Sequence, residues 1–240
     1  MTDRILAMDT STRAQSLALV EDDRVVARKV TTTPNHATTL LRNIDDLMSG
    51  AGWKPADLRL VAVGLGPGTF TGLRVGLANA KAIARSAGAA IVGVDSMEAL
   101  ASPIAALVDG VVVTIADARR GEVYLAKYRA RDGAVTTVAG AEAMLPERAR
   151  ESIAAESGPL VLVGTGLRAF AELTRWERPD VRVLSSAWDA PSSVSIAILA
   201  RRLLEYRGPD DLAALEPNYV RLSDAELNFG PPDAADAGSK

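Results

Sequence analysis

The chain has 240 residues, 48% of them hydrophobic, and a formal net charge of −3 with its histidine neutral. This length allows one large domain or two smaller ones, and the weak negative charge gives no general reason for binding nucleic acid. The sequence contains no cysteine and a single histidine, His36, which excludes disulfides, thiolate zinc sites, cysteine nucleophiles and paired-histidine metal motifs.

The sequence gives no sign of membrane insertion or secretion. No apolar run reaches the length of about 18 residues that a membrane-spanning helix needs. Asp9 lies within a few residues of the first apolar run, which is not typical of a secretory signal. We therefore expect a cytoplasmic protein.

The first half of the chain alternates between strand and helix patterns. Residues 5–31 predict a meander of three strands, with an acidic, hydroxyl-rich first turn at Asp9, Thr10 and Ser11. Apolar residues at helical spacing predict a helix up to Ser49, opened by Pro34 and Asn35. A strand, a helix, a second strand and a further helix follow at residues 58–64, 71–87, 91–96 and 97–108.

The same order begins again in the second half. Residues 111–139 predict three strands, with an acidic turn at Asp117. Residues 160–166, LVLVGTG, repeat the junction between strand and glycine loop that VAVGLG forms in the first half. The repeated order predicts a duplicated βββαβα unit.

The predicted fold is therefore an α/β fold with two subdomains. We expect an N-terminal subdomain over residues 1–105 and a C-terminal subdomain over residues 106–228. Residues 229–240 have no apolar periodicity and are expected to be disordered. Residues 216–221 are expected to pack on the body as an extended segment, because Pro217 cannot continue a helix.

A duplicated βββαβα unit with an acidic turn after its first strand resembles the actin, sugar kinase and heat-shock ATPase superfamily. In that superfamily a nucleotide lies between the two halves, with its phosphates over the first-strand turns. The resemblance implies a vestigial nucleotide site made of Asp9, Thr10, Ser11, Gly164 and Gly166. Because Asp and Thr also form ordinary turns by bonding to their own backbone, the DTST turn is weak evidence alone.

Four motifs carry a narrower resemblance, and the most specific is GPGTFTGLRVG at residues 66–76. The others are MDTST, DARRGEVY and P-x-Y-x-R, at residues 8–12, 117–124 and 217–221. Together they are similar to the bacterial TsaB (YeaZ) family. Members of that family help to place a threonylcarbamoyl group on the adenosine next to the anticodon of tRNAs that read codons beginning with A.

The resemblance implies a non-catalytic subunit that pairs with a larger catalytic relative, TsaD. The P-loop ATPase TsaE would join them, and tRNA would be contacted only through the complex. TsaD has a histidine-containing metal motif on its first-subdomain helix, whereas this chain has only His36 there, with Leu40 in place of the second ligand. A lone histidine at a helix start is more often a cap or surface residue. We expect no catalytic residue, no metal and no cofactor beyond weak nucleotide binding.

Two other functions are weighed against this one. A small-molecule kinase of the same superfamily would use Asp9 to bind Mg²⁺ and Asp117 as general base. Asp117 is equally suited to an ordinary turn, with its carboxylate bonded to backbone N–H groups. A metalloprotease is disfavoured, because zinc would have to be bound mainly by carboxylates.

The helix over residues 71–87 presents two apolar sides, and one of them suits the sheet. The other consists of small residues, which allow another helix to approach closely. With the helix at 36–49 it is predicted to form a four-helix interface, either with TsaD or with a second copy when TsaD is absent. The predicted contacts are Leu41, Met48, Gly72, Val75, Gly76, Ala78 and Ala82. The alternative is that Ala78 and Ala82 lie beneath this chain's own second subdomain.

Four arginines form a basic cluster in the sequence: Arg119, Arg120, Arg129 and Arg131. We expect a solvated surface there, because runs of charge are usually surface. Contact with tRNA inside the complex is the alternative.

Overall fold

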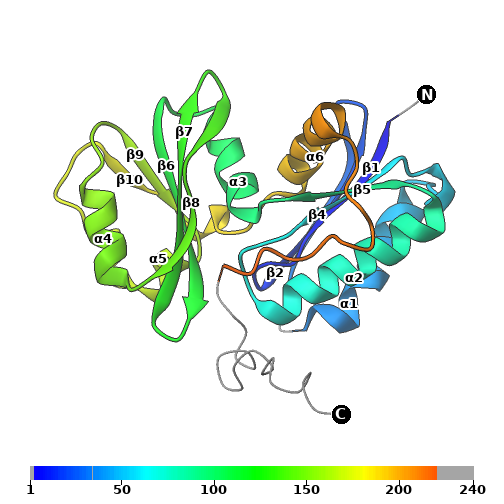
Figure 1. Cartoon of the computed structure of the whole chain (residues 1–240), viewed down its shortest axis with the longest axis horizontal. Coiled ribbons are helices and arrows are strands. Elements are labelled where there is room, and N and C mark those ends of the chain that lie inside the picture. The colour runs from blue at the N-terminus through cyan, green and yellow to red at the C-terminus, as the bar shows by residue number, and fades with distance from the viewer. Residues whose placement is uncertain (1–2, 34, 221–240) are drawn as a thin grey trace, which may run out of the picture.

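The computed structural model describes residues 3–33 and 35–220, which form two α/β lobes side by side (Figure 1). The first lobe contains a five-stranded sheet of order β3-β2-β1-β4-β5. Its strands are β1 (Arg4–Asp9), β2 (Ala14–Glu21), β3 (Arg24–Thr32), β4 (Leu60–Gly64) and β5 (Ala90–Val94). β1 pairs antiparallel with β2 and parallel with β4, so the sheet is mixed.

The second lobe repeats this sheet, with order β10-β9-β6-β7-β8. Its strands are β6 (Gly110–Arg119), β7 (Glu122–Arg131), β8 (Ala134–Met144), β9 (Leu160–Val163) and β10 (Val181–Val183). Counted from β8, the order matches that of the first sheet, with β6 in the place of β1. The structure thus has the predicted duplicated α/β fold with two subdomains.

Helices cover both sheets. They are α1 (His36–Gly50), α2 (Phe70–Ala87), α3 (Ser96–Ala101), α4 (Pro146–Ala154), α5 (Gly166–Ala169) and α6 (Ser193–Arg207). The helix predicted over 97–108 is shorter than expected, since Pro103 lies in a 3-10 turn over Ser102–Ile104. Within the described residues, no helix has both the length and the apolar character needed to cross a bilayer.

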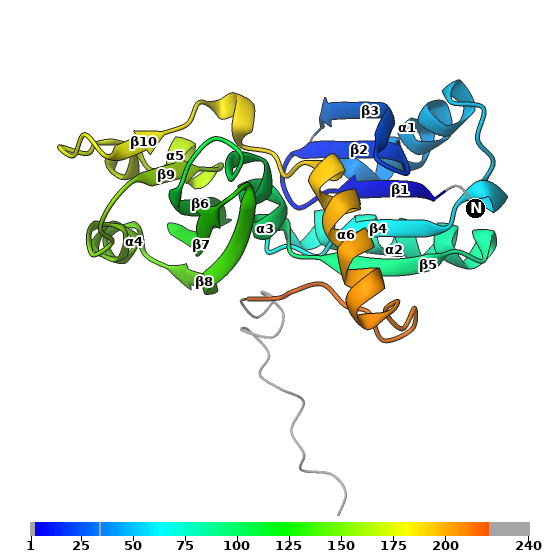
Figure 2. The same cartoon turned by 90° about the horizontal axis from the view of Figure 1, so that it is seen from above.

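Helices cover both faces of the first sheet, and successive strand residues point to opposite faces. Leu6 and Met8 of β1 belong to the core beneath α1 and α2. Ile5 and Ala7 belong to the core on the other face, which α6 covers with Ile196 and its neighbours. Figure 2 shows α6 crossing the strands of this sheet.

The position of α6 corrects the predicted domain boundary. The prediction placed all of residues 106–228 in the second subdomain, but α6 packs against the first sheet because its apolar face covers β1, β2, β4 and β5. The segment after α6 also returns to the first lobe, where Leu212 and Leu215 pack on the α1–α2 core. The predicted disordered tail, 229–240, and Arg221 of the P-x-Y-x-R motif lie outside the described residues.

Candidate functional site

The turn that follows β1 is closed by its own hydrogen bonds. Asp9 is fully buried, and its Oδ1 atom accepts bonds from the backbone N–H of Ser11 at 2.9 Å and from the Ser11 hydroxyl at 2.7 Å. Its Oδ2 atom accepts a bond from the Ser96 hydroxyl at 2.7 Å. Burial raises the pKa of Asp9, although hydrogen bonds from Ser96 and Ser11 act to lower it. Both carboxylate oxygens are therefore engaged inside the chain.

The glycines of the GPGTFTGLRVG motif fit α2 against this turn. The Thr10 hydroxyl donates a hydrogen bond to the Gly72 carbonyl at 2.8 Å. A Cβ atom at Gly72 would collide with the Thr10 carbonyl oxygen, one at Gly76 with the Thr10 hydroxyl, and one at Gly68 with the Ser11 carbonyl oxygen. Glycine is needed at these positions because the backbones lie so close.

Two backbone N–H groups of the glycine loop are also used inside the chain. The Thr69 N–H donates to the Ser11 carbonyl at 2.7 Å, and the Gly66 N–H donates to the Ser96 hydroxyl at 3.0 Å. A phosphate-binding loop directs such N–H groups at the anion instead. The loop therefore serves to position α2.

A cleft of about 420 Å³ lies between the lobes, next to this turn. Residues from both lobes line it, including Ser11, Thr12, Arg13, Asp117, Thr165 and Arg168. Of the predicted nucleotide-binding residues only Ser11 is among the lining residues, since Asp9 and Thr10 are fully buried. Gly164 and Gly166 pack on Ile115 of β6, where an added Cβ would collide with the Ile115 backbone or side chain.

The charged groups of the cleft are largely paired. The Asp117 N–H donates to the Thr165 hydroxyl at 3.0 Å, and the Asp117 carboxylate accepts from the Arg119 N–H at 2.8 Å. The Arg119 guanidinium lies 3.1 Å from the same carboxylate, and Arg168 forms an ion pair with Asp189 at 3.0 Å. This geometry matches the turn interpretation of Asp117.

His36 differs from its prediction as a cap or surface residue. The side chain of Asn35 caps α1, accepting from the Ala37 N–H at 3.1 Å. His36 is buried, and its Nε2 atom lies 2.8 Å from the Thr12 carbonyl oxygen, so Nε2 carries the proton and donates it. Across residues 3–33 and 35–220, no three His, Cys, Asp or Glu side chains come together as a possible metal site.

The small-residue side of α2 is open to solvent. Ala78 and Ala82 are exposed, and on the neighbouring α1 the Leu41 side chain is 60% exposed. The alternative that Ala78 and Ala82 lie beneath the second subdomain is therefore wrong. Val75 is half-buried against the core of the first lobe.

Three of the predicted partner contacts are corrected by the structure. Met48 is buried in the core beneath α1 and α2, because it lies on the side of α1 that faces the sheet. Gly72 and Gly76 are buried against Thr10. The exposed part of the predicted interface is thus Leu41, Ala78 and Ala82, with Val75 at its edge.

The charged side of α2 is covered by the segment that follows α6. The Arg74 guanidinium donates to the Tyr219 hydroxyl at 3.0 Å and lies 3.8 Å from the centre of the Phe70 ring. Lys81 donates to the Ala213 carbonyl at 3.1 Å. This confirms that residues around 217 pack on the body, and the tyrosine of P-x-Y-x-R was the sequence signal for it.

The predicted arginine cluster is divided in space. Arg119 and Arg120 lie at the turn between β6 and β7, whereas Arg129 and Arg131 lie at the other end of β7, beside the hairpin to β8. Residues close in sequence are separated because a strand extends by about 3.3 Å per residue. No single basic patch is formed by these four side chains.

Known proteins resemble the chain over most of its length. An Escherichia coli (strain K12) protein named tRNA threonylcarbamoyladenosine biosynthesis protein TsaB is 36% identical over 173 residues, which are 71% of this chain and 74% of that protein. This chain belongs to the TsaB family. The TsaB protein of Bacillus subtilis (strain 168) is 29% identical over 231 residues, 94% of this chain and 97% of that protein.

The chain also matches the model of a transferase family. The family model described as tRNA N6-adenosine threonylcarbamoyltransferase, TsaD, matches residues 28–229 of this chain, which therefore belongs to that wider family. A crystal structure of a Pseudomonas aeruginosa protein, described as similar to the peptidase YeaZ, has a TM-score of 0.79 and 27% identity, and it covers 91% of this chain and 100% of that chain. The TsaB (YeaZ) resemblance of the motifs is thus confirmed.

Proposed function

We propose that this TsaB-family chain is a non-catalytic subunit in tRNA threonylcarbamoyladenosine biosynthesis, and that it binds a TsaD-like catalytic subunit through α1 and α2. One observation carries the proposal. The side of α2 that bears Ala78 and Ala82 is exposed, while the turns of the cleft are closed by the chain's own hydrogen bonds. The names of the TsaB relatives support a role in tRNA threonylcarbamoyladenosine biosynthesis.

The chemistry of the α1–α2 face supports a helical partner. Small side chains let two helix backbones approach and make many dispersion contacts. Leu41 of the neighbouring α1 is also exposed, and burial of such a side chain contributes about 1.5–3 kcal/mol. The match to the TsaD model supports a partner with the same pair of helices. A face built for a structural relative also accepts a second copy when that relative is absent.

The residues of the cleft support a role without chemistry of its own. Asp9 is buried and fully bonded, and Asp117 is held by the turn and by Arg119. Without cysteine and with one histidine, the chain lacks the usual ligand set of a zinc peptidase. We propose that nucleotide binding here is weak at most, and that a TsaE-like ATPase and tRNA join through the complex in the cytoplasm.

A small-molecule kinase remains the second candidate, because the cleft between the lobes lies where the superfamily binds nucleotides and has two carboxylates, Asp117 and Asp189, in its lining. It predicts ATP turnover by the isolated chain that some small acceptor accelerates. Turnover that disappears in Asp117→Asn would favour it over the scaffold.

Complementation tests the proposed function. A bacterium whose own TsaB gene is repressed receives this chain, and the threonylcarbamoyladenosine content of its tRNA is measured by mass spectrometry. We expect the wild type and Asp117→Asn to restore the modification and Ala78→Arg to lose it. Ala154→Arg, an exposed alanine of α4, is the matched control and should behave as wild type. Loss in Asp117→Asn with the subunit complex intact would contradict a non-catalytic role.

A further inference from the structure

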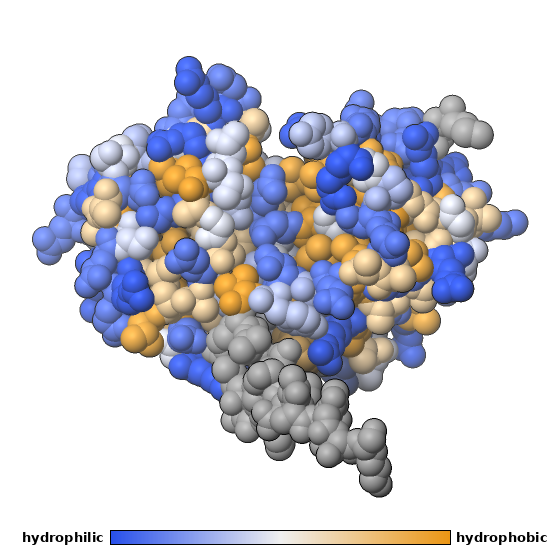
Figure 3. All heavy atoms as spheres, viewed as in Figure 1, coloured by the Kyte–Doolittle hydropathy of each residue, from blue (hydrophilic) through white to orange (hydrophobic). Residues whose placement is uncertain are grey.

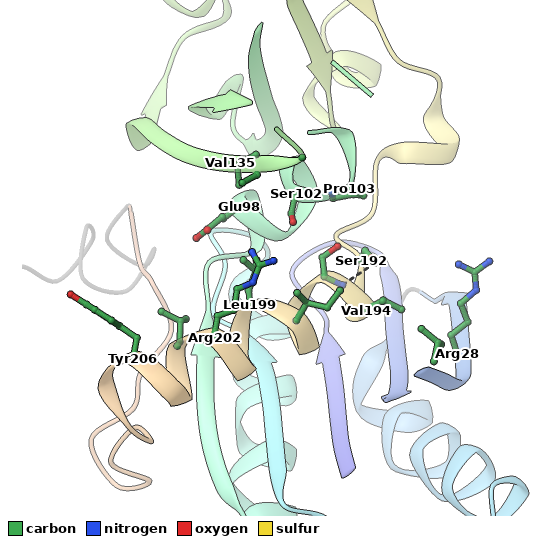
Figure 4. Close-up of a pocket in the computed structure, with 16 residues that line it drawn as sticks. Arg28, Glu98, Ser102, Pro103, Val135, Ser192, Val194, Leu199, Arg202 and Tyr206 are labelled. Carbon is green, nitrogen blue, oxygen red and sulfur yellow. Dashed lines mark hydrogen bonds between the residues drawn. The ribbon is translucent and has the colours of Figure 1, made fainter. Parts of the chain in front are cut away.

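A second hollow, of about 750 Å³, lies between the lobes away from the cleft. The β6–β7 turn of the cleft and the β7–β8 hairpin of this hollow are at opposite ends of β7. Figure 3 shows a notch between the lobes with hydrophobic residues around it, and Figure 4 shows that α6, α3 and β3 surround it. We call this hollow the α6 notch. The α6 notch shares no described lining residue with the cleft, and no described residue of α1 or α2 lines it.

Apolar side chains form most of its walls. On α6 they are Val194, Ile198, Leu199 and Leu203, and Val25 of β3 and Val135 of β8 face them from the two sheets. Ile198 is 37% exposed and Val25 is 42% exposed in the free chain. Exposed apolar residues gathered in a hollow of this volume are typical of a binding site.

The charged lining is mainly cationic. Arg28 and Arg202 line the notch, and neither forms an ion pair with a described residue. Figure 4 shows the Arg202 guanidinium directed from α6 toward α3, which carries Glu98. Glu98 is the one acidic residue among the described lining residues. Burial raises the pKa of Glu98, and the Asp95 carboxylate raises it further, while Arg202 lowers it.

The notch therefore has a positive balance on a chain whose formal net charge is −3. The first turn of α6, with Ser192 at its N-cap, adds partial positive charge at the end near Arg28. A complementary ligand has apolar side chains for the walls and carboxylates for the two arginines.

We propose that the α6 notch binds an acidic amphipathic segment of a second protein, which places apolar side chains against Ile198 and Leu199 and carboxylates beside Arg28 and Arg202. A protein segment is favoured over RNA because apolar side chains dominate the lining. This contact is separate from α1 and α2, so the chain can hold two partners at once.

The test uses a library of random 12-residue peptides displayed on phage and selected on the immobilised full chain. The enriched peptides are then synthesised and titrated by fluorescence anisotropy. We expect peptides that combine Leu, Ile or Phe with Asp or Glu, and we expect Ile198→Asp and Arg202→Glu to weaken their binding at least about tenfold. Arg182→Glu, on β10 at the far edge of the second sheet, is the matched control and should bind as wild type.

The proposal is overturned by no enrichment, by enrichment of basic peptides, or by binding that survives both notch variants. Binding of a labelled tRNA that is lost in Arg202→Glu, without enrichment of acidic peptides, would overturn it in favour of RNA. Thermal unfolding of Ile198→Asp checks that the variant folds, and Arg202→Glu is a second, exposed variant. Light scattering with the TsaD-like subunit should be unchanged in both, which separates this test from that of the proposed function.

Discussion

The two lobes have the same strand order but different helices. In the first lobe the strands equivalent to β8 and β9 are β3 and β4, and they are followed by α1 with 15 residues and α2 with 18. In the second lobe the corresponding helices, α4 and α5, have 9 and 4 residues. Since a helix rises about 1.5 Å per residue, only the first lobe offers two long helices side by side. A duplicated fold can thus place its partner surface on one copy alone.

The first-strand turns differ in the same way. After β1 the Asp9 carboxylate is buried and bonded to Ser11 and Ser96, and the next residue, Thr10, packs against α2. After β6 the Asp117 carboxylate stays at the cleft and pairs with Arg119. The first turn therefore supports the helix that bears the partner face, and the second turn contacts solvent.

Substitution of the helix glycines should have the largest effect on stability. Gly72→Ala and Gly76→Ala each force a Cβ atom onto Thr10, and we expect each to lower the free energy of unfolding by about 1–3 kcal/mol. Urea unfolding measures it. Gly50→Ala in α1, where an added Cβ has open space, is the control and should be neutral or slightly stabilising. If Gly76→Ala is as stable as the wild type, the close packing of α2 against the first-strand turn is contradicted.

The pH dependence of stability should reveal the buried carboxyl group of the first turn. Burial raises the pKa of Asp9 in the folded state, so its stabilising contribution is fully present below the unfolded pKa and is lost as pH rises through the folded pKa. We expect the free energy of unfolding of the wild type to fall relative to that of Asp9→Asn as pH rises above about 4. If the difference in the free energy of unfolding between the wild type and Asp9→Asn does not change with pH, the raised pKa of Asp9 is contradicted.

A smaller effect is expected in the second lobe. Arg168 of α5 pairs with Asp189, in a partly exposed position, and also donates to the Leu184 carbonyl. Arg168→Met should lower the free energy of unfolding by about 1 kcal/mol, since exposed pairs contribute little. Binding of the TsaD-like subunit should be unchanged. Arg182→Met is the matched control, and a loss of binding in Arg168→Met would place the partner on the second lobe.

The smallest effect is expected at the segment that covers α2. Tyr219→Phe keeps the ring beside Phe70 and removes the hydroxyl that accepts from Arg74. We expect a loss of about 0.5 kcal/mol, measured by thermal unfolding. If the variant instead loses several times that amount, the segment holds α2 in place more strongly than the first-strand turn does.

The sequence predicted the repeated strands and the long helices well, because their apolar periodicity is set by burial on one face. It did not predict α6, whose apolar residues cover the first sheet on one side and line the α6 notch on the other. Nor did it show that the DTST turn is closed, because the serine that seals Asp9, Ser96, is 87 residues away in sequence. The prediction placed Met48 on the partner face, because helical spacing alone does not say which side of α1 faces the sheet.

Light scattering on mixtures of this chain with the TsaD-like subunit of the same organism tests the central claim most directly. The account predicts a one-to-one complex with the wild type and with Ala154→Arg, and its loss with Ala78→Arg while that variant stays folded. A complex that survives Ala78→Arg and Leu41→Glu together, or no complex with the wild type at tens of micromolar, would contradict the claim that α1 and α2 form the partner surface.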